Sequence, residues 1–194
     1  MLGNDTLDDV TTLVVDDEKE VADAYALRLR GFCTVETVYG GAEALAAVEA
    51  TDPPIDVVLL DRHMPKMSGD DVLAELRARE FDGRIVMVTA VDPDFDVLDM
   101  PFDDYLCKPV DREDVRAVVD QQRRILAYQT LGEYFSAESK RAVVEAETSP
   151  ERRDDHEGYA AISRRAATLE QRARRLLDDD TIFDEFERIG REEL

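Results

Sequence analysis

The chain has 194 residues, and its 46 acidic and 24 basic side chains leave a formal net charge of −22. That charge is too acidic for an ordinary mesophilic surface. With only four lysines in the chain, it suits a protein that works in concentrated salt, which screens the self-repulsion. The simpler alternative is an acidic surface with no bearing on function, since composition alone identifies no partner.

The longest apolar runs are far shorter than the about 20 residues needed to cross a bilayer, and the amino terminus lacks a signal-peptide pattern. We therefore expect a cytoplasmic protein with no membrane span. Cys33 and Cys107 fall within predicted strands, where each is most simply a small buried hydrophobic residue. His63 and His156 are too few for a histidine metal cluster. The length allows one domain of standard size and a smaller appendage.

Short β-rich runs alternate with helical patterns in the first half of the chain, which is typical of an α/β fold with a doubly wound parallel sheet. Runs such as Val57–Leu60 and Ile85–Val88 are apolar at every position, as in central strands that helices cover on both faces. A short fifth strand is expected just before Lys108. The other expected strands are Thr12–Asp16, Cys33–Tyr39, Ile55–Asp61 and Arg84–Ala90, and the expected helices are Val21–Arg30, Ala42–Ala50 and Asp70–Arg79.

Polar residues end these strands, and ligands bind outside the carboxyl ends of strands in such a sheet. Any one of them could be a capping or turn residue, but together they predict one shared pocket. Three carboxylates repel one another unless a divalent metal or a buried ammonium neutralises them. The pattern therefore predicts an acid pocket with one mobile cation, the chemistry of a phosphorylatable aspartate. The residues are Asp16, Asp17, Asp61, Thr89 and Lys108.

Four motifs, in correct order and spacing, resemble the receiver domain of two-component response regulators over residues 10 to 126. The resemblance implies a flavodoxin-like, five-stranded sheet in the order 2-1-3-4-5. The motifs are Leu13-Val14-Val15-Asp16-Asp17-Glu18, Leu60-Asp61-Arg62-His63-Met64-Pro65-Lys66-Met67-Ser68-Gly69, Thr89-Ala90 and Asp104-Tyr105-Leu106-Cys107-Lys108-Pro109.

The resemblance implies that Asp61 accepts a phosphoryl group from a sensor histidine kinase. It also implies that Asp17, Asp61 and the backbone carbonyl of His63 bind Mg²⁺ or Mn²⁺, with Asp16 in the outer shell. The His63 side chain is expected to tune the rate of dephosphorylation. Such a protein is a signalling switch rather than an enzyme, because its only catalysis is self-phosphorylation from a phosphodonor and autodephosphorylation.

The phosphoryl oxygens would be bound by Lys108, by the Thr89 hydroxyl and by the backbone N–H of Ala90. In the family, the pull on the hydroxyl leaves space for the ring of an aromatic residue, so Thr89 and Tyr105 are the expected switch. The Lys108-Pro109 bond is cis in many relatives.

The segment between Thr89 and Lys108 departs from the family, which usually has an amphipathic helix there. Pro93 and Pro101 bracket it and leave little room for a standard helix. That helix usually belongs to the output face, so the signalling surface of this chain is expected to differ.

The rest of the chain is predicted to be helical and resembles the HalX regulators of halophilic archaea. The expected domains are an acidic tail over residues 1–9, a receiver domain over 10–126 and a helical HalX-like domain over 127–194. Residues 159 to 176 show apolar steps of three and four, which fit an internal helix hairpin or a dimer contact. The expected helices are Asp111–Tyr128, Leu131–Glu147, Tyr159–Asp178 and Thr181–Arg191, with a break from Ser149 to Gly158.

Three functions remain open. The leading one is a phosphorylation-driven switch whose helical region reports the state of Asp61 to a partner protein or a second copy. A DNA-binding regulator is possible but not favoured, because residues 127 to 194 hold 17 acidic and 11 basic residues and no helix-turn-helix pattern. An aspartate-nucleophile phosphohydrolase is least favoured, because that class usually has a second aspartate where His63 stands.

Overall fold

The computed structural model describes residues 7–52, 54–90, 95–154, 156–178 and 181–183. The chain divides into two compact units, residues 1–123 and residues 124–194, and each is described by itself. Among the described residues, none of the helices combines the length and the apolar character that crossing a membrane requires.

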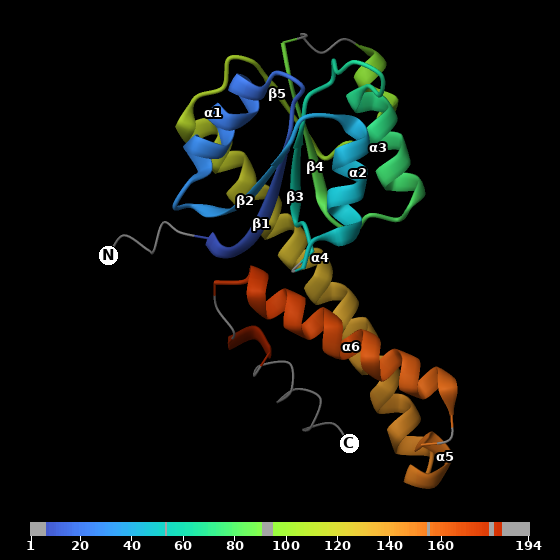
Figure 1. Cartoon of the computed structure of the whole chain (residues 1–194). Helices are drawn as coiled ribbons and strands as arrows, with labels where there is room; N and C mark the ends of the chain where they lie inside the picture. The colour runs from blue at the N-terminus through green and yellow to red at the C-terminus, as the bar shows by residue number, and fades with distance from the viewer. Residues whose placement is uncertain (1–6, 53, 91–94, 155, 179–180, 184–194) are drawn as a thin grey trace. The chain divides into compact units, whose positions relative to one another are not determined.

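The first unit contains a parallel five-stranded sheet in the order β2-β1-β3-β4-β5 (Figure 1). This confirms the predicted fold class. Strand β3 is buried at every position, as its wholly apolar sequence predicted. The strands are β1 (Leu7–Val15), β2 (Cys33–Val38), β3 (Val57–Leu60), β4 (Arg84–Thr89) and β5 (Asp104–Cys107).

Two expectations at the margins of the sheet are wrong. Strand β1 begins at Leu7, so the last three residues of the expected acidic tail belong to the sheet. Cys33 is buried, and burial raises the pKa of its thiol. Cys107, in contrast, is exposed, because it ends the edge strand β5, which has a neighbour on one side only.

Helices cover both faces of the sheet, with α2 (Gly41–Ala50) and α3 (Gly69–Ala78) on one face and α1 (Lys19–Leu29) on the other (Figure 1). The face under α2 and α3 holds an apolar core, which includes Leu60 and Met87. This packing fixes the strands, and with them the residues that follow their carboxyl ends.

The segment between β4 and β5 contains only a short 3₁₀ helix, η1 (Phe95–Asp99), in its described part. The expectation that a standard helix does not fit there is confirmed for residues 95 to 103. Residues 91–94, which include the first bracketing proline, lie outside the described residues.

Helix α4 (Arg112–Glu147) is one continuous element of 36 residues, so the expected pair of helices is wrong. The expected boundary, Gln129-Thr130, contains neither proline nor glycine. The Thr130 hydroxyl instead donates to the Leu126 carbonyl 2.8 Å away, inside the helix. The chain thus passes from the first unit into the second within this helix.

The second unit also contains α5 (Pro150–Asp154), which lies inside the expected break, and α6 (Glu157–Leu176). Residues 181–183 are helical, and residues 184–191 of the last expected helix lie outside the described residues. Three residues of the predicted seam in α6 are buried. A small core forms around them and α4, and its buried members are Leu131, Tyr134, Ala173 and Phe183.

Candidate functional site

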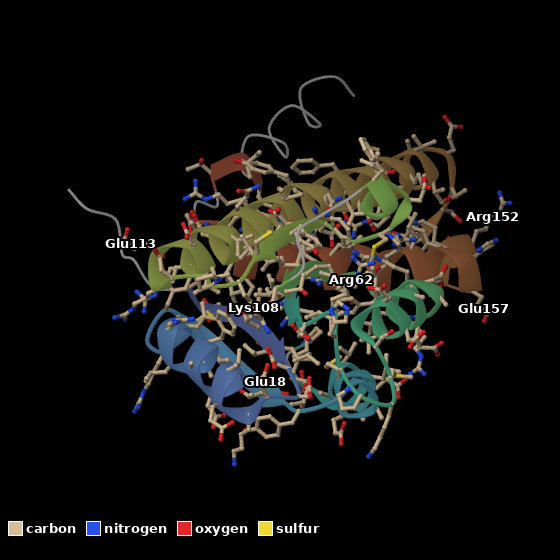
Figure 2. All side chains as sticks on the ribbon, turned by 90° about the horizontal axis from the view of Figure 1, so that it is seen from above. Glu18, Arg62, Lys108, Glu113, Arg152 and Glu157 are labelled. Atoms are coloured by element: carbon tan, nitrogen blue, oxygen red, sulfur yellow. The ribbon has the colours of Figure 1, made fainter. Side chains whose placement is uncertain are left out.

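Lys108 lies between two of the predicted carboxylates at the carboxyl edge of the sheet. Its Nζ atom is 2.6 Å from Asp16 Oδ2 and 2.7 Å from Asp61 Oδ1. Asp16 and Asp61 are only 2% and 7% exposed. Figure 2 labels Lys108 at this edge, together with Glu18 and Arg62 from the two loops that follow the aspartates. One ammonium therefore neutralises one of two buried carboxylates and leaves the cluster with a negative charge.

The protonation of Lys108 follows from these contacts. Burial alone would lower the pKa of its ammonium, but the hydrogen bonds and charges of Asp16 and Asp61 outweigh burial. The pKa therefore lies above the ordinary lysine value, and the side chain is a cation at neutral pH.

The sheet itself brings these residues together, because each follows the end of a strand. The backbone N–H of Asp61 donates to the Val15 carbonyl at 2.9 Å, and that of Lys108 donates to the Thr89 carbonyl at 2.8 Å. The pairing of β1 with β3 and of β4 with β5 thus continues one residue beyond the strands. The Lys108-Pro109 peptide bond is cis.

The second oxygen of each aspartate is held by the loop that follows it. Asp16 Oδ1 accepts from the Glu18 N–H at 2.9 Å, and Asp61 Oδ2 accepts from the His63 N–H at 2.8 Å. The imidazole of His63 is exposed. Each carboxylate is therefore fixed in orientation before any ligand arrives, by Lys108 through one oxygen and by its own loop through the other.

The backbone of Gly69 lies close to the Asp61 carbonyl, a contact that the sequence did not reveal. A Cβ atom at position 69 would lie 2.1 Å from the Asp61 carbonyl oxygen, so no side chain fits without moving the loop that follows Asp61. Ser68, which precedes Gly69, forms a capping box with Asp71 at the start of α3, in which Ser68 Oγ accepts from the Asp71 N–H. These contacts fix the return of the chain from Asp61 into the helix.

The other predicted residues lie on, or directly after, strands of the same sheet. Thr89 is buried at the end of β4 and Ala90 is exposed directly after it. Asp17 is partly exposed beside Asp16. Tyr105 is half-buried on β5, and its ring centre is 5.6 Å from that of Phe102. The structure therefore brings Lys108 into direct contact with Asp16 and Asp61 and places the other predicted residues on, or directly after, β1, β4 and β5.

The donor set fits a hard divalent cation. Among the described residues, no three acidic, histidine or cysteine side chains are grouped closely enough to hold a metal alone. Mg²⁺ does not need such a cage, because it usually keeps several waters and binds one or two carboxylates together with phosphate oxygens. Asp61 and Asp17 with one backbone carbonyl would satisfy that requirement, and receiver domains generally bind Mg²⁺ at this acidic pocket.

Tyr25 of α1 is a residue of this region that sequence reasoning missed. It is buried, and burial raises the pKa of its phenol, while the charges of Lys108 and Asp16 act on the same group. Its ring also faces the Arg28 guanidinium at 5.0 Å. An aromatic residue on the inner side of a helix reads as ordinary core, so the sequence offers no signal for its nearness to the site.

Residues 12–120 match the family model of the response regulator receiver domain, which covers more than half of the chain. The chain belongs to the receiver-domain family of response regulators. Residues 124–190 match the HalX domain. Both parts of the resemblance described above are thereby confirmed.

Curated relatives agree with this assignment. A candidate transcriptional regulator of Haloferax volcanii is 44% identical over 144 residues, which are 73% of this chain and 24% of the relative. The sensory transduction protein RegX3 of Mycolicibacterium smegmatis is 44% identical over 105 residues, 51% of this chain and 44% of the relative. The chain thus spans about a quarter to a half of the length of these relatives.

A solved structure of the same fold is the BeF₃-activated receiver domain of DrrB. It is 27% identical, with a TM-score of 0.52, and the match covers 58% of this chain and 95% of that domain. The match is confined to a receiver domain, so it bears on the receiver part of the present chain alone.

Proposed function

We propose that the chain is a phosphorylation-driven switch in which Asp61 accepts a phosphoryl group from a sensor histidine kinase. The observation that carries the proposal is the position of Lys108, whose ammonium bonds both Asp16 and Asp61. The family supports the general role, because response regulators are signalling proteins rather than classical enzymes. The helical region that follows would report the state of Asp61.

In the proposed reaction, a carboxylate oxygen of Asp61 attacks the phosphorus of a phosphohistidine. The new P–O bond forms as the P–N bond breaks, and the imidazole leaves with its electron pair. The attack brings one anion toward another, so catalysis depends on positive charge near the transferring group. Lys108 supplies such a charge and can move from Asp61 to a phosphoryl oxygen while it keeps Asp16 as a partner.

The proposed Mg²⁺ or Mn²⁺ site consists of Asp17, Asp61 and the backbone carbonyl of His63, with Asp16 in the outer shell. The cation would offset the charge of the phosphoryl group. The chain already orients the Asp61 carboxylate for this role, because Asp61 Oδ2 accepts from the His63 N–H. We assign the His63 imidazole to the control of dephosphorylation, because His63 is exposed and lies two residues after Asp61.

The proposed switch consists of Thr89 and Tyr105. The Thr89 hydroxyl and the Ala90 N–H would donate to phosphoryl oxygens, and the ring of Tyr105 would take the space that the hydroxyl leaves. Its half-buried position beside Phe102 supports this assignment, because a ring there has one packed side and one open side. The readout is expected in the helical region, through a partner protein or a second copy, in the cytoplasm.

The test is the intact mass of the protein after incubation with a small phosphodonor in concentrated salt, with Mg²⁺ or with a chelator. We expect a phosphoryl adduct on the wild type with Mg²⁺, and none with the chelator or on Asp61→Asn. Asp82→Asn is the matched control, because Asp82 is an exposed aspartate in a turn, and it should accept phosphate like the wild type. An adduct on Asp61→Asn equal to that on the wild type would refute the proposal.

A second candidate function is DNA-binding regulation, which the name of the Haloferax volcanii relative favours. The acidity of the helical region argues against a simple basic footprint. Specific retention of DNA in molar salt, by the phosphorylated protein only, would support this candidate. Retention that is equal with and without phosphate would point to nonspecific binding.

A further inference from the structure

The opposite edge of the sheet holds a second cluster of charged side chains, which lies at the amino ends of β4 and β5. We call it the Asp103–Asp104 network. Its members come from α3, from β4, from β5 with the residue before it, and from α4. They are Arg77, Arg84, Asp103, Asp104 and Gln122.

Asp103 holds the entry to β5 against its neighbours. Its carboxylate accepts from Arg77 Nη2 at 2.5 Å, from Arg84 Nη1 at 3.0 Å and from the Ile85 N–H at 2.6 Å. Arg77 also donates through Nε to the Pro101 carbonyl at 3.0 Å. The segment that takes the place of a standard helix is therefore tied to α3 and β4 by charged contacts.

Gln122 connects this network to helix α4. Its side chain is 1% exposed, and both ends of its amide are used. Gln122 Oε1 accepts from Arg84 Nε at 2.9 Å, and Gln122 Nε2 donates to Asp104 Oδ2 at 2.8 Å. A buried amide with a donor and an acceptor on opposite sides fits only one orientation, so it fixes the position of the helix relative to both strands.

Asp104 carries the connection into the proposed switch strand. Its other oxygen, Oδ1, accepts from the backbone N–H of Tyr105 at 2.8 Å. Strand β5 is only four residues long, and Lys108 follows its last residue. One carboxylate therefore touches the residue proposed as the aromatic switch on one side and the helix on the other.

Helix α4 continues from Gln122 into the second unit, whose boundary lies at Arg123 and Arg124. We propose that the hydrogen bond from Gln122 to Asp104 couples strand β5 to helix α4 and carries the state of Asp61 into the helical region. Gln122 is in this sense a positioning residue that touches no reacting atom. The inference rests on the proposed function and names the contact through which the phosphorylation state of Asp61 would be transmitted out of the receiver domain.

The amide of residue 122 and the carboxylate of residue 104 can be exchanged, and this exchange distinguishes a loss of coupling from a loss of stability. Gln122→Leu removes both bonds. In Gln122→Glu with Asp104→Asn, Arg84 still donates to residue 122, and the new amide of residue 104 donates where it formerly accepted. The double variant keeps the total charge and the donor–acceptor match, while Gln122→Glu alone sets two carboxylates against each other. Gln121→Leu is the matched control, because Gln121 is the preceding residue of the same helix and is exposed.

The experiment measures two quantities on the full chain in concentrated salt, with and without a small phosphodonor and Mg²⁺. The first is the phosphorylated fraction from intact mass, and the second is the hydrogen exchange of residues 124 to 147. In the wild type and in Gln121→Leu we expect phosphorylation to change the exchange of this segment. Gln122→Leu should take up phosphate to within about twofold of the wild type and lose most of that change, and the swapped pair should regain it.

The two proposals fail differently in this design. A wild type that accepts no phosphate would overturn the proposed function, and the coupling with it. A Gln122→Leu variant that is phosphorylated and still shows the full exchange change would overturn the coupling alone. A swapped pair that folds and accepts phosphate but shows no exchange change would also overturn it.

Discussion

The two edges of the sheet both pair acids with cations, but in different proportions. At the carboxyl edge, Lys108 is shared between Asp16 and Asp61, so the contacts leave one negative charge uncompensated. At the amino edge, two arginines and an amide meet Asp103 and Asp104, and the charges balance. An unbalanced cluster is ready to take up a cation or to exchange partners, whereas a balanced one holds a shape. The difference fits the phosphoryl transfer proposed at one edge and the coupling proposed at the other.

The largest expected effect breaks the balanced edge. Asp103→Ala leaves two arginines and a strand N–H without their shared acceptor. Leaving the donors of a partly buried network without their acceptor typically costs about 1–3 kcal/mol of unfolding free energy. Urea denaturation in concentrated salt would measure this loss. The control Asp82→Ala, at an exposed turn position, should change stability by no more than about 0.5 kcal/mol, and equal losses in both variants would contradict the structural role.

The next effect removes the shared cation from the unbalanced edge. Lys108→Met should slow phosphorylation by about 100-fold, the effect of losing one preorganised donor at a reacting centre. The initial rate of adduct formation, followed by intact mass, measures it. Lys66→Met is the control, because Lys66 is an exposed lysine of the Asp61 loop. If both variants reacted at the wild-type rate, Lys108 would have no role in the transfer.

A smaller effect concerns the loop that holds Asp61. Ser68→Ala removes the side-chain cap of α3, which typically costs about 1 kcal/mol. Thermal unfolding would detect the loss. Ser136→Ala on the exposed side of α4 removes a hydroxyl without a capping role, and it should leave the unfolding free energy almost unchanged. A loss in Ser136→Ala as large as in Ser68→Ala would show that the cap does not matter.

The smallest effect is a pH dependence of stability. The folded protein has a raised Lys108 pKa, so the ion pairs contribute fully below the ordinary lysine value of about 10.4. Their contribution is lost as the pH rises through the raised folded value. Between pH 8 and pH 11, the unfolding free energy of the wild type should therefore fall more than that of Lys108→Met. Parallel pH profiles of the two proteins would assign the alkaline loss to other groups.

The carboxyl edge could be predicted from the sequence because its residues end recognisable strands. Asp61 follows an apolar run and Lys108 follows a short one, and parallel topology brings such ends together. The amino edge could not be predicted in this way. Asp103 precedes β5 and Asp104 begins it, and a polar side chain at the start of a strand carries no information about partners far away in the chain.

A weak signal for the missed network did exist. Gln122 lies on the buried side of its helix, between Val119 and Leu126, where a buried amide requires a partner. The continuity of α4 across Gln129 was also readable, because no helix-breaking residue stands there. Exposure of Cys107 was not, since both cysteines belong to edge strands and only one of them is exposed.

The length of α4 gives the connection at Gln122 a mechanical meaning. From Gln122 to Glu147 the helix extends for about 38 Å, at 1.5 Å per residue. Under the proposed coupling, it would act as a lever whose pivot lies at the hydrogen bond to Asp104. A tilt of only about 5° at the pivot, acting over that helix length, would displace the far end by about 3 Å, which is the diameter of a water molecule. A rearrangement at Tyr105 too small to change the fold of the sheet could thus become a displacement large enough for a partner protein to detect.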